Sequence, residues 1–338
     1  MKIKILCTLG PASLKPDVLE GLDRRGVDLF RINLSHTRPD EVENIIDLIE
    51  RHSAAPICLD TQGAQIRCGK MTPEVVIDQG ASVTLTPSPV VGTRNQIPLW
   101  PPSIFELLEP GTEMTIDFDA ASVQVTDVCH DHAEAVVLRG GRVRSNKAVT
   151  PTPAIYLPAL SDVDRSAIAI GRRRGIQHYA LSFAGDASDV AALRELAPGG
   201  AHIIAKIESR TGVRNMDEII NVADSVLVDR GDLSREIPIE QVPYFQKAIV
   251  RRANRWNRPV YVATNLLESM VTSRVPTIAE ANDVANTLLD GVHGLVLAAE
   301  TAVGCDPVGA VDMVLRTVAA FERSTDSQLI DDPPTVAV

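Results

Sequence analysis

Residues 202–232 read HIIAKIESRTGVRNMDEIINVADSVLVDRGD, and this stretch decides the fold of the chain. It contains two apolar runs, at 203–207 and 226–228, and each run is followed by charged residues. The segment between them, roughly 212–223, carries apolar side chains at helical spacing. The pattern predicts a strand, a helix and a second strand, with ionisable groups at the carboxyl ends of both strands.

Three ionisable side chains are expected to meet at these strand ends. Lys206 and Glu208 are two residues apart, so an extended strand points both side chains to one face. Asp232 follows the next strand after an Arg-Gly turn. Gathering a cation and two carboxylates is costly for stability alone, whereas such a set suits a divalent ion and an anionic substrate. The competing interpretation is a buried salt-bridge network without chemistry.

Composition restricts the class of protein. The net charge of -11 over 338 residues argues against nucleic acid or an anionic membrane as the main partner. The five scattered cysteines form no CxxC pair, which is typical of reduced thiols. The N-terminus does not resemble a signal peptide, and no apolar run reaches the roughly 18 residues of a membrane-spanning helix. We therefore expect a cytoplasmic protein.

Strand and helix patterns alternate along most of the chain. The predicted strands are 4–8, 28–33, 56–60, 178–182, 203–207, 226–228, 259–264 and 294–298. The predicted helices are 17–25, 39–51, 162–173, 187–196, 212–223, 240–257, 278–290 and 307–322. Such alternation favours parallel strand pairing, and eight units of this kind close as a (β/α)₈ TIM barrel.

One segment, from about Cys68 to Leu157, has a different character. Its strand-like runs are 75–77, 82–85, 114–116, 122–128 and 133–138, and its only helix-like feature is a turn near 102–108. We therefore predict a barrel built from 1–67 and 158–325, and an all-β lid domain at 68–157 inserted after the third strand. Residues 326–338 are predicted to form a loose tail.

The functional residues of a TIM barrel lie at the carboxyl ends of its strands. In this chain those ends present Thr8, Arg31, Asn33, Ser35, Asp60, Thr61, Ser182, Lys206, Glu208, Asp232, Thr264 and Glu300. Nearly every strand contributes a polar group, and a purely structural barrel has no need of so many.

Eight stretches distributed over almost the whole chain resemble the signatures of one family. They are CTLGPAS, RINLSH, LDTQGAQIR, AKIES, RGDLSREIP, ATNLLESM, PTIAEANDVANTLLDG and AETAVG. In this order they resemble the motifs of pyruvate kinase, and the all-β insertion lies where that family carries its lid. The chain stops after the eighth helix, so the resemblance predicts a short form without the family's C-terminal regulatory domain.

The resemblance implies a phosphoenolpyruvate site with a divalent ion. Glu208 and Asp232 would ligate Mg²⁺ or Mn²⁺, which favour carboxylate oxygens. Lys206 would neutralise charge on the transferring phosphoryl group. Thr264 would take part in protonating the enolate, although an ordinary capping hydroxyl is the equally weighted alternative.

The remaining site residues implied by the resemblance fall into three groups. The substrate would meet Ser182, Thr264 and the backbone amides of Gly231 and Asp232, as anions meet helix N-termini. The phosphates of a nucleotide would meet Arg31, Asn33, His36, Arg67 and Lys147. Potassium would be held by Asn33, Ser35, Asp60 and Thr61.

The chain departs from the family pattern at several positions. Val303 stands where the family has a lysine facing the nucleotide, Ala298-Ala299 replaces Ser-Gly, and Phe118 replaces an aspartate of the lid. Asp229 replaces an alanine before Arg230. Most of the departures surround the expected nucleotide rather than the phosphoenolpyruvate site.

The predicted function is therefore phosphoryl transfer from phosphoenolpyruvate to a nucleoside diphosphate, as in glycolysis, by a protein that forms a homo-oligomer such as a dimer. The first alternative is a metal-dependent pyruvate-enolate enzyme with a different acceptor, such as an aldolase, a lyase or another phosphotransferase. The second alternative is a non-catalytic protein that senses phosphoenolpyruvate.

Overall fold

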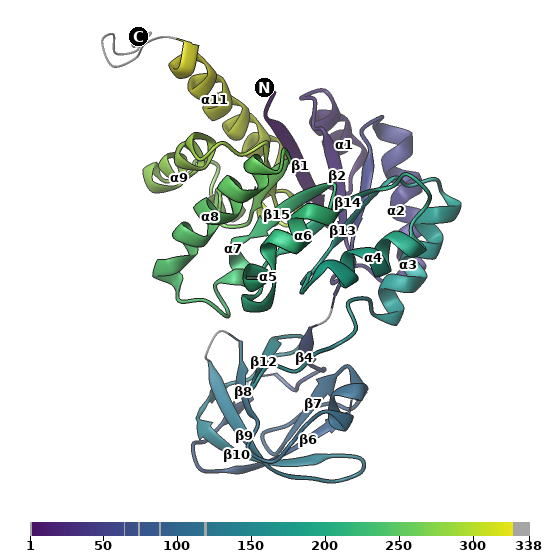
Figure 1. Cartoon of the computed structure of the whole chain (residues 1–338), viewed down its shortest axis with the longest axis vertical. Coiled ribbons are helices and arrows are strands. Elements are labelled where there is room, and N and C mark those ends of the chain that lie inside the picture. Colours follow the sequence, from purple (N-terminus) through teal and green to yellow (C-terminus); the bar gives the residue numbers. More distant parts are fainter. Residues whose placement is uncertain (1, 64, 74, 88, 118–119, 327–338) are drawn as a thin grey trace. The chain divides into compact units, whose positions relative to one another are not determined.

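A computed structural model describes the chain except for residues 1, 64, 74, 88, 118–119 and 327–338 (Figure 1). The chain forms two compact units. The first consists of Met1–Gly63 and Ala159–Val338, and the second of Ala64–Pro158. Most of the predicted tail, 327–338, lies outside the described residues.

The first unit is a closed barrel of eight parallel strands in the order β1-β17-β16-β15-β14-β13-β3-β2. The strands are β1 (Lys4–Leu9), β2 (Leu29–Asn33), β3 (Ile57–Asp60), β13 (His178–Leu181), β14 (His202–Ile207), β15 (Ser225–Asp229), β16 (Val260–Ala263) and β17 (Gly294–Leu297). The predicted TIM barrel is thus confirmed. Since β3 pairs directly with β13, the insertion interrupts the chain but not the sheet.

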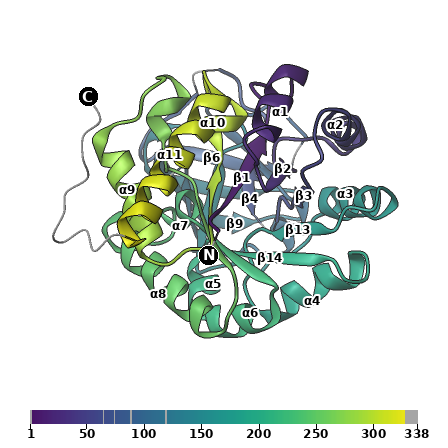
Figure 2. The same ribbon diagram turned by 90° about the horizontal axis from the view of Figure 1, so that it is seen from above.

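Helices surround the strands of this barrel (Figure 2). They are α1 (Pro16–Asp23), α2 (Pro39–His52), α3 (Asp162–Arg173), α4 (Ala187–Leu196), α5 (Arg210–Arg214), α6 (Met216–Val222), α7 (Arg230–Leu233), α8 (Val242–Arg255), α9 (Ile278–Leu289), α10 (Ala299–Ala302) and α11 (Pro307–Asp326), with 3₁₀ turns η2 (Ile239–Gln241) and η3 (Glu268–Val271). Side-chain caps begin several of them, such as Ser161 at α3 and Thr277 at α9. Among the described residues, none of the helices is both long and apolar enough to cross a membrane.

The strands bury both faces, and their side chains alternate between two cores. On β14, Ile203, Ala205 and Ile207 pack in the core that the helices share with the barrel wall. Ile204 belongs to a smaller core inside the barrel, together with Leu227 of β15. Because strand side chains alternate with a period of two, Lys206 shares the inward direction of Ile204, as the sequence predicts.

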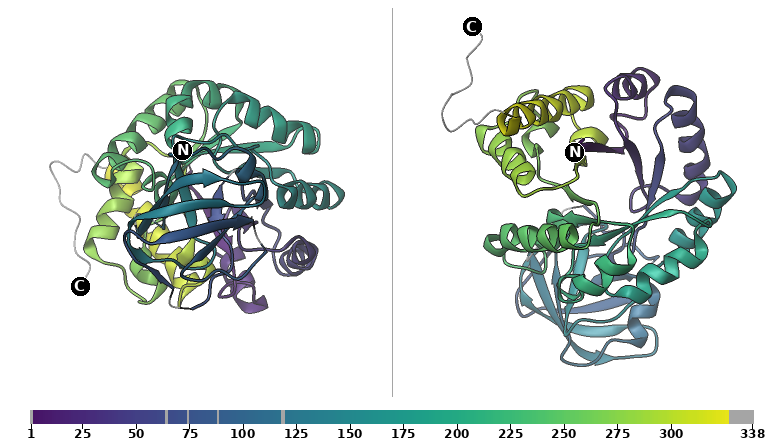
Figure 3. Two further views of the ribbon diagram at one scale, coloured as in Figure 1. Left: turned by 90° about the horizontal axis from the view of Figure 1, so that it is seen from below. Right: turned by 45° about the horizontal axis from the view of Figure 1, so that its top comes forward.

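The second unit is all-β, as predicted, apart from the 3₁₀ turn η1 (Pro102–Glu106) (Figure 3). One closed barrel has the strand order β10-β6-β7-β4-β12-β8-β9, and β5 pairs with β11. The strands are β4 (Ile66–Cys68), β5 (Val76–Ile77), β6 (Ser82–Pro87), β7 (Gln96–Trp100), β8 (Glu113–Ile116), β9 (Ala121–Val128), β10 (Ala133–Arg139), β11 (Gly141–Arg142) and β12 (Ala148–Thr152). The unit has its own apolar core, which includes Leu85, Ile97, Met114 and Val123.

The single helix predicted at 212–223 is wrong in one respect. The structure has two helices there, α5 and α6, and they meet at Asn215, whose φ of -100° and ψ of 15° are not helical. The Asn215 side chain donates to the carbonyl oxygen of Gly185, 2.8 Å away. This tertiary hydrogen bond accompanies the break, which apolar spacing alone does not reveal.

Candidate active site

Five ionisable side chains form a buried cluster where the barrel strands end. They are Arg31, Asp60, Lys206, Glu208 and Asp229, and each is at most 5% exposed. Charged side chains are rarely buried this deeply unless they are paired. The cluster contains two cations and three carboxylates, so its stability depends on the pairing between them.

Lys206 is the centre of this cluster. Its Nζ lies 3.1 Å from Glu208 Oε2, 3.6 Å from Asp60 Oδ1 and 3.9 Å from Asp229 Oδ2. It also donates a hydrogen bond of 3.0 Å to Ser182 Oγ. Burial opposes its charge, but the three carboxylates outweigh burial and raise the pKa of Lys206. The side chain is therefore a buried cation that can oppose an anionic ligand.

Only one of the two carboxylate oxygens of Glu208 accepts a hydrogen bond from the described residues. Its Oε1 accepts a hydrogen bond of 2.8 Å from the amide of Phe183. Its Oε2 is buried and accepts no hydrogen bond from any described residue, although Lys206 is close enough for ion pairing. Burial raises the pKa of Glu208 to about 8; Lys206 opposes this rise, whereas Asp232 and Asp229 add to it. A cation bound here would stabilise the ionised carboxylate of Glu208 and lower its pKa.

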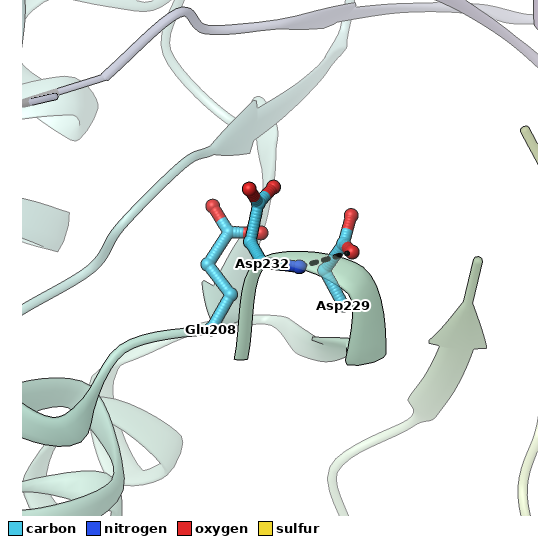
Figure 4. Close-up of side chains that lie close together, drawn as sticks. All are labelled: Glu208, Asp229 and Asp232. Carbon is cyan, nitrogen blue, oxygen red and sulfur yellow. Dashed lines mark hydrogen bonds between the residues drawn. The ribbon is translucent and has the colours of Figure 1, made fainter. Parts of the chain in front are cut away.

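Three carboxylates form a group suited to such a cation. Each of Glu208, Asp229 and Asp232 offers one oxygen, and these oxygens lie within 4.8 Å of one another (Figure 4). Carboxylate oxygens are the donors that Mg²⁺ and Mn²⁺ prefer. The donor set and the unsatisfied Glu208 oxygen therefore fit a divalent ion. The sequence predicted Glu208 and Asp232 in this role and missed Asp229.

Binding of Mn²⁺ to the metal-free protein is expected to release a proton at neutral pH. With a pKa of about 8, Glu208 is mostly protonated without a cation, and a ligating carboxylate must lose its proton. Release should approach roughly one proton per ion well below this pKa and should fall towards zero above it. Titration calorimetry in two buffers of different ionisation enthalpy measures this number.

The Glu208→Gln protein is the control for this measurement, since it should release almost no proton. A release that did not change between pH 7 and pH 9 would contradict the assignment to Glu208. The raised pKa also affects folding. Because the folded-state pKa lies above the ordinary value of 4.5, this group favours the metal-free fold at low pH, and the contribution is lost as pH rises through about 8.

Thr264 lies directly after β16 in a strained conformation. Its φ is +68°, a value that β-branched residues rarely adopt. Its Oγ1 accepts a hydrogen bond of 2.8 Å from the amide of Gly231 and donates to Asp229 Oδ1 at 2.9 Å, with the carbonyl oxygen of Ala263 as a second acceptor. The guanidinium of Arg230 donates to the Thr264 carbonyl oxygen at 2.7 Å. Strain held by this many contacts is typical of functional positions.

Two backbone amides of the site have acceptors within the protein. The amide of Gly231 donates to Thr264 Oγ1, and the amide of Asp232 donates to Asp229 Oδ1 at 3.3 Å. The prediction that these two amides receive the substrate carboxylate stays a prediction; in this structure both hydrogens have side-chain acceptors. The sequence could not reveal this, since the acceptors come from Thr264 and Asp229.

The residues predicted to hold potassium lie at or just after the ends of the neighbouring strands β2 and β3. Asn33 and Asp60 are direct neighbours in the register of these strands. Thr61 Oγ1 accepts from the amide of Ser182 at 2.9 Å, and Asn33 Oδ1 accepts from the amide of Ser35 at 2.9 Å. Asp60 also lies near two cations, since its Oδ2 is 3.2 Å from Arg31 Nε and its Oδ1 is 3.6 Å from Lys206 Nζ.

Arg31 has unused hydrogen-bonding capacity. Its Nε and Nη1 atoms are buried and have no hydrogen-bond partner in the described part of the chain, because the ion pair with Asp60 lacks hydrogen-bond geometry. The hydroxyl of Thr8, on the neighbouring strand, is also buried and has no hydrogen-bond partner among the described residues. Buried polar atoms are rarely unsatisfied in folded proteins, so these atoms indicate a polar ligand at the strand ends.

The other predicted nucleotide residues are divided between the two units. His36 is exposed on the loop after β2, and Val303 is 57% exposed after α10. Arg67 and Lys147 belong to the second unit, where Lys147 pairs with Asp117 at 3.2 Å. Phe118, the substituted lid position, lies outside the described residues.

Comparisons with known proteins agree with this architecture. The family model for the barrel domain of pyruvate kinase matches residues 1–311. The pyruvate kinase of Methylorubrum extorquens is 39% identical over 330 residues, covering 95% of this chain and 69% of that protein. The pyruvate kinase of Geobacillus stearothermophilus is also 39% identical, over 339 residues, with 95% of this chain and 58% of that protein covered.

A solved structure is also similar to this chain. The crystal structure of a pyruvate kinase from Cryptosporidium parvum superposes with a TM-score of 0.83 at 31% identity, covering 95% of this chain and 69% of that one. The family, the fold and the enzyme class that the motifs predicted are therefore confirmed. The chain belongs to the pyruvate kinase family and is a phosphotransferase of the kinase type.

Proposed function

We propose that the protein transfers the phosphoryl group of phosphoenolpyruvate to a nucleoside diphosphate. The observation that carries this proposal is the buried Lys206 surrounded by carboxylates at the ends of the barrel strands. A buried cation beside a carboxylate set that fits a divalent ion suits a substrate bearing a phosphate and a carboxylate.

The proposed chemistry has two steps. The bond between phosphorus and the enol oxygen breaks, its electrons remain on that oxygen, and a new bond forms between phosphorus and a terminal oxygen of the nucleoside diphosphate. The resulting enolate of pyruvate then takes a proton at its methylene carbon. When bound, the divalent ion supplies Lewis-acid stabilisation of the charge on the enol oxygen.

The residues of this chain have distinct proposed roles. Glu208 and Asp232 hold Mg²⁺ or Mn²⁺, and Lys206 and Arg31 neutralise the transferring phosphoryl group. Ser182 orients Lys206, whose Nζ donates to its hydroxyl. Thr264 lies on the path of the proton that reaches the enolate.

Further residues have proposed roles in binding the nucleotide and potassium. Arg31, Asn33, His36, Arg67 and Lys147 would meet the nucleotide phosphates, and Asn33, Ser35, Asp60 and Thr61 would hold potassium. The four predicted potassium ligands present side-chain oxygens, which suits a monovalent cation. We also propose a homo-oligomer, such as a dimer, as in the family resemblance. We place the activity in the cytoplasm because all five cysteines are unpaired.

Proton NMR tests the proposal. Pyruvate is incubated in D₂O with Mg²⁺ and phosphate, and phosphoenolpyruvate is then supplied with and without ADP. Deuteration of the methyl group together with ADP-dependent pyruvate formation is the expected result. Deuteration without ADP-dependent transfer would indicate an enolate enzyme with a different acceptor, in line with Val303. The absence of both would overturn the proposal in favour of a sensor.

A further inference from the structure

Asp229 is a carboxylate inside the barrel that the proposed chemistry has not yet used. It is the last residue of β15, and its side chain follows the inward direction of Leu227, two residues earlier. Only 4% of its surface is exposed. An ionisable group in such a position requires partners.

The first oxygen of Asp229 holds the side chain of Thr264. Oδ1 accepts the hydroxyl hydrogen bond of 2.9 Å, and it also accepts the amide of Asp232 at 3.3 Å. Since the amide of Gly231 donates to the same hydroxyl, Thr264 Oγ1 lies between a donor and a carboxylate acceptor. A cross-strand contact explains this arrangement, because Asp229 is the register partner of Ala263.

The same carboxylate belongs to the charge cluster around the divalent-ion site. Its Oδ2 lies 3.9 Å from Lys206 Nζ, and one of its oxygens is within 4.8 Å of ligand oxygens of Glu208 and Asp232. Figure 4 shows three side chains extending in one direction: Glu208, which directly follows β14, Asp229 of β15 and Asp232 of α7. The unsatisfied buried Oε2 of Glu208 independently indicates that a ligand completes this group.

We propose that Asp229 links the divalent-ion site to Thr264. Through Oδ1 it is a positioning residue that fixes the Thr264 hydroxyl, and through its charge it adds a third carboxylate to the ion's site. An alanine at this position would supply neither the acceptor nor the charge. The inference rests on the proposed function, because it assumes that Glu208 and Asp232 hold the ion.

Two substitutions distinguish the effect of the hydrogen-bond acceptor of Asp229 from the effect of its negative charge. Asp229→Asn keeps an oxygen that can accept from Thr264 but removes the negative charge, whereas Asp229→Ala removes both. Mn²⁺ affinity without substrate is measured by electron paramagnetic resonance of the free ion. Exchange of the pyruvate methyl protons in D₂O with Mg²⁺ is measured by NMR at saturating metal.

Both variants are expected to bind Mn²⁺ about 10- to 100-fold more weakly than the parent protein, because the number of charged ligands sets affinity for hard cations. Asp229→Ala should also exchange methyl protons at least about tenfold more slowly at saturating Mg²⁺. Asp229→Asn should retain most of the exchange rate, because its amide oxygen still orients the hydroxyl.

Asp229 also caps α7, so a control for the loss of a helix cap is needed. Thr277→Ala removes the exposed cap of α9, which bonds to Glu280, and should change neither readout. An Asp229→Ala protein whose Mn²⁺ affinity or exchange rate stayed within about twofold of the parent would overturn the link. A parent protein that bound no Mn²⁺ would instead overturn the proposed ion site on which the link depends.

Discussion

Replacing Lys206 with Met is expected to reduce phosphoryl transfer by at least about 10³-fold, the scale associated with removing a single charge-stabilising group from a transition state. Met preserves the length of the side chain but removes the buried cation that Glu208, Asp60 and Asp229 surround. Transfer is measured by ³¹P NMR of phosphoenolpyruvate in the presence of ADP and Mg²⁺.

Mn²⁺ binding by the same variant should be retained or strengthened, because a positive charge beside the ion's carboxylates has been removed. The fold should lose about 3 kcal/mol, since the carboxylates then lack their buried counter-ion. The free energy of unfolding from urea titration measures this loss and shows whether the variant is folded during the assay.

Lys247→Met is the matched control for this experiment. Lys247 lies on α8 and pairs with Asp290 at a site that is 40% exposed for the lysine side chain. The control should retain full turnover and lose less stability than Lys206→Met, because the pair is only partly buried and Gln246 still donates to Asp290. Undiminished transfer in the Lys206→Met protein would exclude the proposed role of the lysine.

Removing the hydroxyl of Thr264 should separate the two proposed steps. In Thr264→Ala we expect methyl proton exchange to fall about 10²- to 10⁴-fold, the range for loss of a proton-transfer group. Phosphoryl transfer should fall much less, because Lys206 and Arg31 remain. The two rates are measured on the same samples by proton and ³¹P NMR.

Thr264→Ser is the matched control, because serine keeps the hydroxyl between Gly231 and Asp229. It also lacks the β-branch that is unfavourable at a φ of +68°. This variant should therefore exchange methyl protons at close to the parent rate. Equal losses of exchange and transfer in Thr264→Ala would indicate that the residue organises the whole site rather than the proton step.

The barrel and part of the candidate site can be predicted from the sequence because both follow from the periodicity of the strands. A period of two in short apolar strands places Lys206 and Glu208 on one face, and parallel strands bring their ends together. These are local rules. They apply before any tertiary contact is known.

The same period of two also predicts the position of Asp229. The resemblance marked it only as a departure from an alanine, yet counting by two from Leu227 places it inside the barrel. Its hydrogen bond with Thr264 could not be predicted, because that bond depends on register between β15 and β16. The strands β4, β7 and β12 were missed for a similar reason, since their pairing within the second unit is non-local.

The pairing of β3 with β13 affects the order in which the chain can fold during translation. These strands are adjacent in the barrel although the whole second unit is synthesised between them. Within that unit, β4 and β12 pair near its two ends, with Arg67 opposite Ala148. Because the unit has its own core, its early folding would bring those ends together and shorten the loop that the barrel must close. Folding of the inserted unit would then help β3 and β13 to pair while the barrel forms.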